Sequence, residues 1–268
     1  MFDMGLEDDR KLFQGESVIV TGAAQGLGLQ IAASFAARGA GVLMADRNKE
    51  GVESAADELQ KCSSSKISWT VTDVSDETSV TAMKDTALAE FGRIDHLVNN
   101  AGILHIGSTV ETPSNKFRQL MDVNVLGVHL GMQAVLPVML RQGSGSIVNL
   151  SSLAGKKALE NLGAYCASKA AVLSLTQVAA LEYAPTVRVN AVCPGVVETP
   201  MQQTEYQVFS AMTGKTESEL KDDWLSGLPM GQFQQPVNIA EAVCFLASKR
   251  AAQITGEAVA VNGGLMMD

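Results

Sequence analysis

The chain has 268 residues, 46% of them hydrophobic and 18% charged, and a net charge of −9. These values are typical of a globular protein with a sizeable core, and the length fits one large α/β domain. The acidic balance argues against nucleic acid and anionic membrane surfaces as partners, because both require clustered Lys and Arg. We also expect no membrane span, since no apolar run in the sequence approaches the required length of roughly 20 residues.

The four cysteines form no CxxC pair and the first residues do not have the layout of a secretory signal. Both features favour reduced thiols and a cytoplasmic location. We expect residues 1–14 to be a flexible acidic leader before a single domain at 15–268. The three histidines, His96, His105 and His129, lack metal-ligand spacing, so no metal site is predicted.

Short apolar runs alternate with helical segments along the chain. We expect strands at 17–20, 41–45, 66–74, 96–102, 145–152, 187–195 and 257–264. Helices are expected at 27–39, up to about 61, and at 76–91, 114–140, 161–183 and 237–248. This alternation predicts a single Rossmann-type doubly wound α/β domain, with a parallel sheet of about seven strands and helices on both faces.

A glycine-rich turn follows the first expected strand. The segment TGAAQGLG (21–28) places Gly22, Gly26 and Gly28 between a buried strand and a helix. Small residues let such a turn approach a pyrophosphate, which then lies on N–H groups at the helix N-terminus. Glycines can also simply make a tight turn, but their place in a strand–turn–helix unit predicts dinucleotide binding.

The second expected strand leads into Asp46, eighteen residues after Gly28. A carboxylate there can accept hydrogen bonds from both adenosine ribose hydroxyls and would repel a 2′-phosphate, which favours NAD. The neighbouring Arg47 could instead receive that phosphate, which leaves NADP as the less favoured alternative.

Tyr165 and Lys169 lie four residues apart in an Ala-rich stretch and would share one face of a helix. Most such pairs are surface pairs without chemistry. Oxidation of a secondary alcohol, however, needs a group that takes the hydroxyl proton. An ammonium at about 4 Å would lower the pKa of a phenol by about three units, and the positive nicotinamide ring of an oxidised cofactor would act in the same direction. Both effects favour Tyr165 as a base. Ser152 could then stabilise the developing alkoxide with a hydrogen bond.

Several motifs follow one another in a fixed order: TGAAQGLG (21–28), Asp73–Val74, NNAG (99–102), Asn124, Ser151–Ser152, YCASK (165–169) and PGVVET (194–199). Through these motifs and their order the chain resembles the short-chain dehydrogenase/reductase family in its single-domain form, over about residues 15–264. The resemblance implies a catalytic set of Asn124, Ser152, Tyr165 and Lys169. It implies cofactor contacts from Gly22, Gln25, Gly26, Leu27, Gly28, Asp46, Arg47, Asp73, Val74, Asn100, Ala101, Gly102, Tyr165, Lys169, Pro194, Gly195, Val197 and Thr199.

The family resemblance also implies individual roles. Asp73 would bond the adenine amino group, Asn99 would help to fix the central sheet and the ribose side, and Asn124 would hold a water that links Lys169 to solvent. The segment from Pro194 to Thr199 would orient the nicotinamide carboxamide.

Three segments are expected to enclose the substrate. They are a helical lid at about 198–235, the loop at 103–108 and the loop at 153–162. In the last loop we expect Lys156, Lys157, Glu160 and Asn161 to form a polar wall. Glu160 and Asn161 favour a polyol, diol or sugar-type secondary alcohol, whereas either lysine could recognise an acid group.

Three functions therefore stay open. The first is an NAD-dependent dehydrogenase of such an alcohol. The second is an NADPH-dependent carbonyl reductase, for example of a 3-oxoacyl thioester, and the third is a dinucleotide-binding protein without turnover. The family resemblance further implies a homo-oligomer, a dimer or a homotetramer, paired through the helices expected at 114–140 and 161–183.

Overall fold

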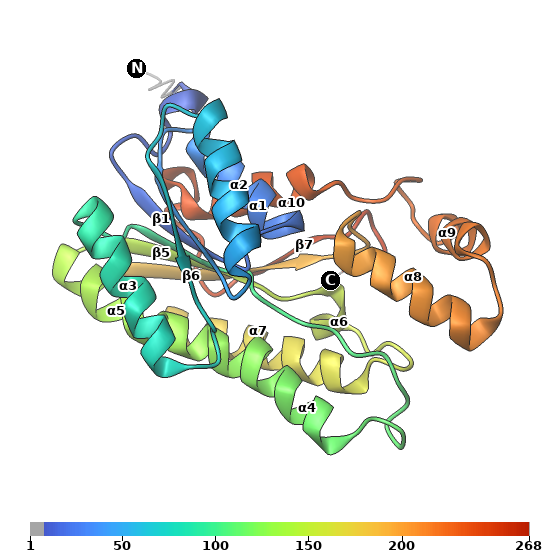
Figure 1. Ribbon diagram of the computed structural model, residues 1–268. Helices are drawn as coiled ribbons and strands as arrows, with labels where there is room; N and C mark the ends of the chain where they lie inside the picture. Colours follow the sequence, from blue (N-terminus) through green and yellow to red (C-terminus); the bar gives the residue numbers. More distant parts are fainter. Residues whose placement is uncertain (1–7, 268) are drawn as a thin grey trace.

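The computed structural model describes residues 8–267 and contains one sheet (Figure 1). Its strands lie in the order β3-β2-β1-β4-β5-β6-β7, and every neighbouring pair is parallel. The strands are β1 (Ser17–Thr21), β2 (Gly41–Asp46), β3 (Ile67–Val71), β4 (His96–Asn99), β5 (Gly145–Leu150), β6 (Val187–Pro194) and β7 (Ala258–Val261). The predicted doubly wound fold is confirmed.

Helices cover both faces of the sheet (Figure 1). One face carries α1 (Gly26–Ala36), α2 (Lys49–Cys62) and α10 (Pro236–Ala247), and the other carries α3 (Glu77–Phe91), α5 (Gly127–Gln142) and α7 (Gly163–Tyr183). Beyond these layers lie α4 (Ser114–Met121), α6 (Leu153–Lys156), α8 (Pro200–Thr213), α9 (Glu217–Ser226) and the short helices η1 (Asp9–Lys11) and η3 (Lys249–Ala251).

The burial of β1 explains why the strands appear in the sequence as continuous runs of apolar residues. All five of its residues are buried. Val18 and Val20 contribute to the core on one face, whereas Ile19 contributes to the core on the other. A parallel sheet that is covered on both faces needs apolar side chains at successive positions, because neither face meets solvent.

The structure differs from the sequence prediction at several element boundaries. The third strand ends at Val71 rather than at 74, because the backbone then turns and Asp73 accepts hydrogen bonds from the amide and hydroxyl of Ser75. The long helix expected at 114–140 contains a π-helical segment, η2 (Asp122–Leu126), between α4 and α5. The short helix α6 was not predicted.

The expected leader at 1–14 lies only partly within the described residues, which begin at residue 8. From there the chain packs against the domain. Phe13 is fully buried, and its ring stacks on Phe35 with ring centres 4.6 Å apart. Asp9 forms ion pairs with Arg38 and Arg250. The packed fold therefore starts before the predicted boundary at 15.

Two helical stretches, Ser114–Gln142 and Gly163–Tyr183, are long and apolar enough to cross a membrane by length and composition alone. Core helices of globular proteins meet the same criterion. Both stretches contribute buried residues to the core on one face of the sheet, so packing against the sheet accounts for their apolar character.

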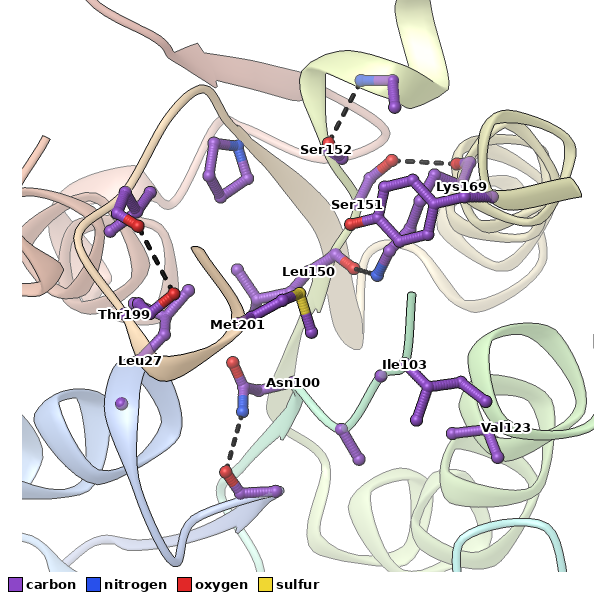
Figure 2. Close-up of a pocket in the computed structure, with 18 of the residues that line it drawn as sticks. Leu27, Asn100, Ile103, Val123, Leu150, Ser151, Ser152, Lys169, Thr199 and Met201 are labelled. Carbon is purple, nitrogen blue, oxygen red and sulfur yellow. Dashed lines mark hydrogen bonds between the residues drawn. The ribbon is translucent and has the colours of Figure 1, made fainter. Parts of the chain in front are cut away.

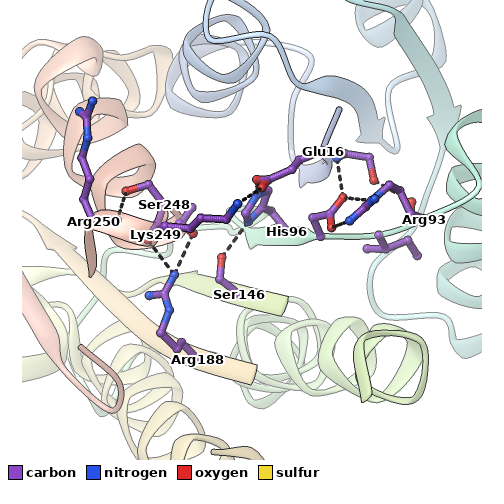
Figure 3. Close-up of polar contacts among 12 residues, drawn as sticks. Glu16, Arg93, His96, Ser146, Arg188, Ser248, Lys249 and Arg250 are labelled. Atoms are coloured by element: carbon purple, nitrogen blue, oxygen red, sulfur yellow. Dashed lines mark hydrogen bonds and ion pairs between the residues drawn. The ribbon is translucent and has the colours of Figure 1, made fainter. Parts of the chain in front are cut away.

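Polar contacts gather near the amino ends of the strands, as Figure 3 shows. His96, at the start of β4, lies between Glu16 and Ser146, and each ring nitrogen is 2.8 Å from its partner's oxygen. On β6, Arg188 donates hydrogen bonds to the carbonyls of Leu246, Ala247 and Ser248, at 2.6–3.0 Å. These carbonyls end α10, so Arg188 ties the C-terminus of that helix to the sheet.

Replacing Arg188 with Met should leave the terminal carbonyls of α10 without these donors. We expect the free energy of unfolding to fall by about 2–4 kcal/mol, as for the loss of several partly buried charge-assisted hydrogen bonds. Urea unfolding followed by circular dichroism measures the change. Arg141→Met, at an exposed position, is the matched control and should shift stability by less than about 0.5 kcal/mol. Equal stability of the two variants would contradict the helix-tying role.

Candidate active site

A cavity of about 710 Å³ lies at the carboxyl ends of the strands. Its lining comes from the turns that follow β1, β2, β3, β4, β5 and β6, together with residues of α4, η2, α7 and α8. The cavity includes the place where β1 and β4 lie side by side and the strand order reverses, which is where open α/β sheets bind ligands. The predicted site residues that line it are Gly22, Gln25, Gly26, Leu27, Asp46, Arg47, Asp73, Val74, Asn100, Ala101, Gly102, Ser152, Tyr165, Lys169, Pro194, Gly195, Val197 and Thr199.

The glycine-rich turn has the tight geometry that the sequence predicts. Gly22 has a φ of +65°, and a Cβ atom there would lie 2.8 Å from the Cα of Ala101. A Cβ on Gly28 would lie 2.1 Å from the carbonyl oxygen of Gly22, so Gly28 lets α1 pack against the turn without lining the cavity itself. Gln25, the residue before α1, makes no side-chain cap. The first amides of α1 are therefore available to a phosphate.

Asp46 lies at the end of β2 and beside this turn. One of its carboxylate oxygens accepts a hydrogen bond from the Ala24 amide at 3.1 Å, and the other accepts from the Asn48 amide at 3.0 Å. These bonds fix the carboxylate at the edge of the cavity. The exposed side chain of Arg47 borders the same cavity. The cavity edge therefore holds both a carboxylate that could bind ribose hydroxyls and a guanidinium that could bind a 2′-phosphate.

Asp73 also reaches the cavity and is held as an anion. Hydrogen bonds from the hydroxyl and amide of Ser75, at 2.6 and 2.9 Å, lower the pKa of its carboxyl, and the charge of Arg47 adds to this effect. An ionised Asp73 is an acceptor, as bonding to an adenine amino group would require.

The two asparagines that follow Val98 have different surroundings. Asn100 lines the cavity and donates to the carbonyls of Thr21 and Gly22, which joins the end of β4 to the glycine-rich turn (Figure 2). Asn99 is buried and donates to Asn149 on β5. Its side chain therefore bonds across the sheet, and it is not among the residues that line the cavity.

Ser152, Tyr165 and Lys169 converge on one wall of the cavity. Lys169 is buried, and its Nζ donates to the carbonyl of Leu150 at 2.8 Å (Figure 2). Nζ also lies 5.7 Å from the centre of the Tyr165 ring. Ser152, the residue before α6, lines the same cavity as Tyr165 and accepts from the Ala154 amide at 3.1 Å. The three side chains predicted to carry proton transfer are thus in one place.

Burial opposes the ionisation of this group. It raises the pKa of Tyr165 above its ordinary value of about 10, the Glu205 charge raises it further, and the nearby Ser152 hydroxyl opposes both effects. Burial also lowers the pKa of Lys169 to about 8. That Lys169 and an oxidised nicotinamide together make Tyr165 a usable base stays a prediction, and the cost of burying a phenolate is an opposing effect that the sequence does not show.

Asn124 lies in the π-helical segment and does not line the cavity. Its side chain accepts from the Ile103 amide at 2.8 Å and donates to the Ile103 carbonyl and the Ser168 hydroxyl, both at 3.0 Å. A Cβ built on Gly102 would lie 3.4 Å from both Asn124 Oδ1 and Lys169 Nζ. Asn124 therefore lies behind the lysine and fixes the loop after β4.

The loop at 153–162 forms a different wall from the one predicted. None of the four polar residues expected there, Lys156, Lys157, Glu160 and Asn161, lines the cavity. The loop instead contributes Leu153, Ala154, Leu159 and Leu162. Leu153, Ala154 and Leu162 are buried and Leu159 is partly buried, whereas Lys157 and Glu160 are exposed to solvent.

The lid contributes polar groups to the cavity through α8, whose faces the sequence did not resolve. Met201, Gln202 and Glu205 of α8 line the cavity, and Figure 2 labels Met201. Glu205 lies three residues after Gln202 and four after Met201, and this spacing is the signal that could have marked one helix face. The lid aromatics pack instead, with Tyr206 stacked on Trp224 and Phe209 against the same indole.

The fit to a nicotinamide dinucleotide is good. Uncapped amides, a glycine cradle that a Cβ would fill, and an anchored carboxylate meet at one cavity. Among residues 8–267, no group of three or more His, Cys, Asp or Glu side chains could hold a metal ion.

A family model described as enoyl-(acyl carrier protein) reductase matches residues 22–266. The chain belongs to the short-chain dehydrogenase/reductase family. As a short-chain dehydrogenase/reductase, it is an oxidoreductase that acts on alcohol and carbonyl groups with a nicotinamide dinucleotide.

This short-chain dehydrogenase/reductase is 41% identical to 2-(R)-hydroxypropyl-CoM dehydrogenase from Xanthobacter autotrophicus, over 91% of the chain and 96% of the relative. It is 35% identical to the 3-oxoacyl-[acyl-carrier-protein] reductase FabG of Thermotoga maritima, over 95% of the chain and 99% of the relative. D-threitol dehydrogenase from Mycolicibacterium smegmatis is 36% identical, over 98% of the chain and 96% of the relative.

A solved structure of an actinorhodin polyketide ketoreductase with NADPH superposes with a TM-score of 0.90. The two sequences are 34% identical, and the match spans 93% of this chain and 97% of the ketoreductase chain. The relatives of this short-chain dehydrogenase/reductase thus include both dehydrogenases and carbonyl reductases.

Proposed function

We propose that this short-chain dehydrogenase/reductase oxidises an uncharged, polyol-like secondary alcohol with NAD. The observation that carries the proposal is the convergence of Ser152, Tyr165 and the buried Lys169 on one cavity, which they share with the glycine-rich turn. The similarity to D-threitol dehydrogenase supports a polyhydroxylated substrate.

Tyr165 acts as the acid/base in this scheme. Its oxygen takes the hydroxyl proton while the substrate carbon loses hydride, and it returns the proton in the reverse reaction. Ser152, which lines the same cavity as Tyr165, hydrogen-bonds the substrate oxygen and stabilises its developing charge. A bound nicotinamide dinucleotide supplies the hydride acceptor or donor.

Two cationic influences have to offset the burial of Tyr165. One is the ammonium of Lys169, which faces the ring from 5.7 Å. The other is the positive charge of the oxidised cofactor. Since both favour the phenolate, Tyr165 becomes a base only in the loaded enzyme. The carbonyl of Leu150 and the contacts of Asn124 hold Lys169 and its surroundings in place.

The preference for NAD rests on Asp46. Its carboxylate is fixed by two backbone amides at the cavity edge, where it accepts bonds from ribose hydroxyls and repels a 2′-phosphate. The alternative is an NADPH-dependent carbonyl reductase. Arg47 at the same edge favours it, as does the similarity to FabG and to a ketoreductase solved with NADPH.

We also propose that the protein is a cytoplasmic homo-oligomer, a dimer or homotetramer. Support for assembly comes from exposed apolar side chains on α5 and α7, namely Leu140, Val178 and Leu181. Leu181 is 84% exposed, as expected for a residue that a second copy covers.

Tyr165→Phe should abolish most turnover and preserve cofactor binding, because the phenyl ring keeps the packing and loses only the proton-carrying oxygen. We expect kcat to fall by roughly 10²–10⁴. Steady-state kinetics with NAD and a polyol panel measure the loss, and NADH fluorescence titration checks binding. Retention of near-normal kcat would remove Tyr165 from the proton-transfer role.

Asp46→Ala should narrow the preference for NAD over NADP by roughly tenfold or more, because a charge-assisted contact to ribose and a repulsion of phosphate both disappear. The ratio of kcat/KM values with the two cofactors measures it. Asp57→Ala, at an exposed position on α2, is the control and should leave the ratio unchanged. If Asp46→Ala leaves it unchanged too, Asp46 does not read the ribose.

A further inference from the structure

The lid helix α8 presents one acidic group to the cavity. Glu205 is partly buried and lines the same cavity as Tyr165. Gln202, one turn earlier on α8, is 5% exposed although it belongs to the lid, and its Nε2 donates to Glu205 Oε2 at 3.0 Å. The amide thus holds one oxygen of the carboxyl group and leaves the other, Oε1, for a ligand.

Within the part of the chain that the structure describes, Glu205 has no cationic partner. Its bond from Gln202 is its single side-chain hydrogen bond there, and no Lys, Arg or His forms an ion pair with it. A carboxyl group used only for packing the lid would normally be paired or exposed. Burial raises the pKa of Glu205 to about 7, opposed by the bond from Gln202. Near neutrality the group therefore exchanges between an acid, which can donate, and a carboxylate, which can only accept.

The loop and the lid also contribute apolar side chains to this cavity. Leu153, Leu159, Leu162 and Met201 are among the residues that line it. A ligand pocket lined mainly by apolar groups derives its specificity from the few polar groups within it. On the lid side of the cavity, Glu205 and Gln202 are polar residues to which the proposed proton transfer assigns no role.

We propose that Glu205, positioned by Gln202, is a specificity-determining residue that hydrogen-bonds a second hydroxyl on the carbon next to the reacting carbinol. This inference rests on the proposed function. It narrows the substrate class to vicinal diols and polyols. It also implies discrimination against substrates that carry an anionic group at that position, because such a group would meet an acidic side chain in a partly buried site.

The alternatives differ in charge. A hydroxyl can bond either protonation form of Glu205, as donor to the carboxylate or as acceptor from the acid. An ammonium would be bound by the carboxylate form and would make an amino alcohol the better substrate. An acid group would be repelled. These three cases give different rankings among small substrates of equal length.

The test compares kcat/KM for butane-2,3-diol, butan-2-ol, 3-aminobutan-2-ol and 3-hydroxybutyrate in the full-length enzyme with NAD and NADP. We call kcat/KM for butane-2,3-diol divided by kcat/KM for butan-2-ol the diol ratio. In Glu205→Ala the diol ratio should fall by roughly tenfold, as expected for the loss of one hydrogen bond to the substrate. Glu205→Gln keeps a donor and an acceptor, so it should retain most of the diol ratio and should lose discrimination against 3-hydroxybutyrate.

Gln203→Ala serves as the control, because Gln203 is exposed on the same helix and should not affect the ratio. The diol ratio is insensitive to a uniform loss of folded enzyme, so a purely structural role for Glu205 would leave it unchanged. An unchanged ratio in an active Glu205→Ala enzyme, or a wild-type preference for the amino alcohol over the diol, overturns the inference alone. Failure of the wild-type enzyme to oxidise any of the four alcohols overturns the proposed function and this inference with it.

Discussion

The candidate site depends on the hydrogen bond between the buried Lys169 ammonium and the carbonyl of Leu150. This bond joins the first turns of α7 to the last residue of β5. A second bond, from the hydroxyl of Ser151 to the carbonyl of Lys169 at 2.8 Å, links α7 to the residue that follows β5. Together they fix where α7 starts relative to Ser152, so that Ser152 and Tyr165 line the same cavity.

The ends of the sheet differ in what they contain. Near the amino ends, His96, Glu16 and Arg188 have protein partners, and their contacts close the fold. At the carboxyl ends, the first amides of α1 are uncapped and the carboxyl group of Glu205 is only partly satisfied. Groups that are incompletely paired within the protein are the ones that remain to bind a ligand.

The fold could be predicted from the sequence because parallel strands covered on both faces produce short apolar runs. The glycine-rich turn also located the first strand–helix unit. The sequence was also sufficient to gather Ser152, Tyr165 and Lys169, whose spacing places them around one loop. The π-helical segment could not be predicted, since its cause is the set of bonds that Asn124 makes with Ile103 and Ser168. The effect of burial on the Tyr165 pKa could not be predicted either, because burial is a property of the assembled cavity.

The residues that face the substrate from the lid could not be predicted from the sequence either. Sequence reasoning sought polarity in the loop that contains Glu160 and Asn161, whereas the cavity receives Glu205 and Gln202 from α8. Which face of a lid helix points inward depends on how Tyr206 and Trp224 pack together. That packing is tertiary information, which a composition of mixed polar and apolar residues does not contain.

In the proposed mechanism, Lys169 and the oxidised cofactor together make the buried Tyr165 a base. The pH dependence of kcat/KM for alcohol oxidation at saturating NAD is the decisive measurement. We expect the rate to rise with pH through one ionisation well below the ordinary tyrosine pKa of about 10. That ionisation should move upward in Lys169→Met. An ionisation at the same pH in both enzymes would contradict this mechanism.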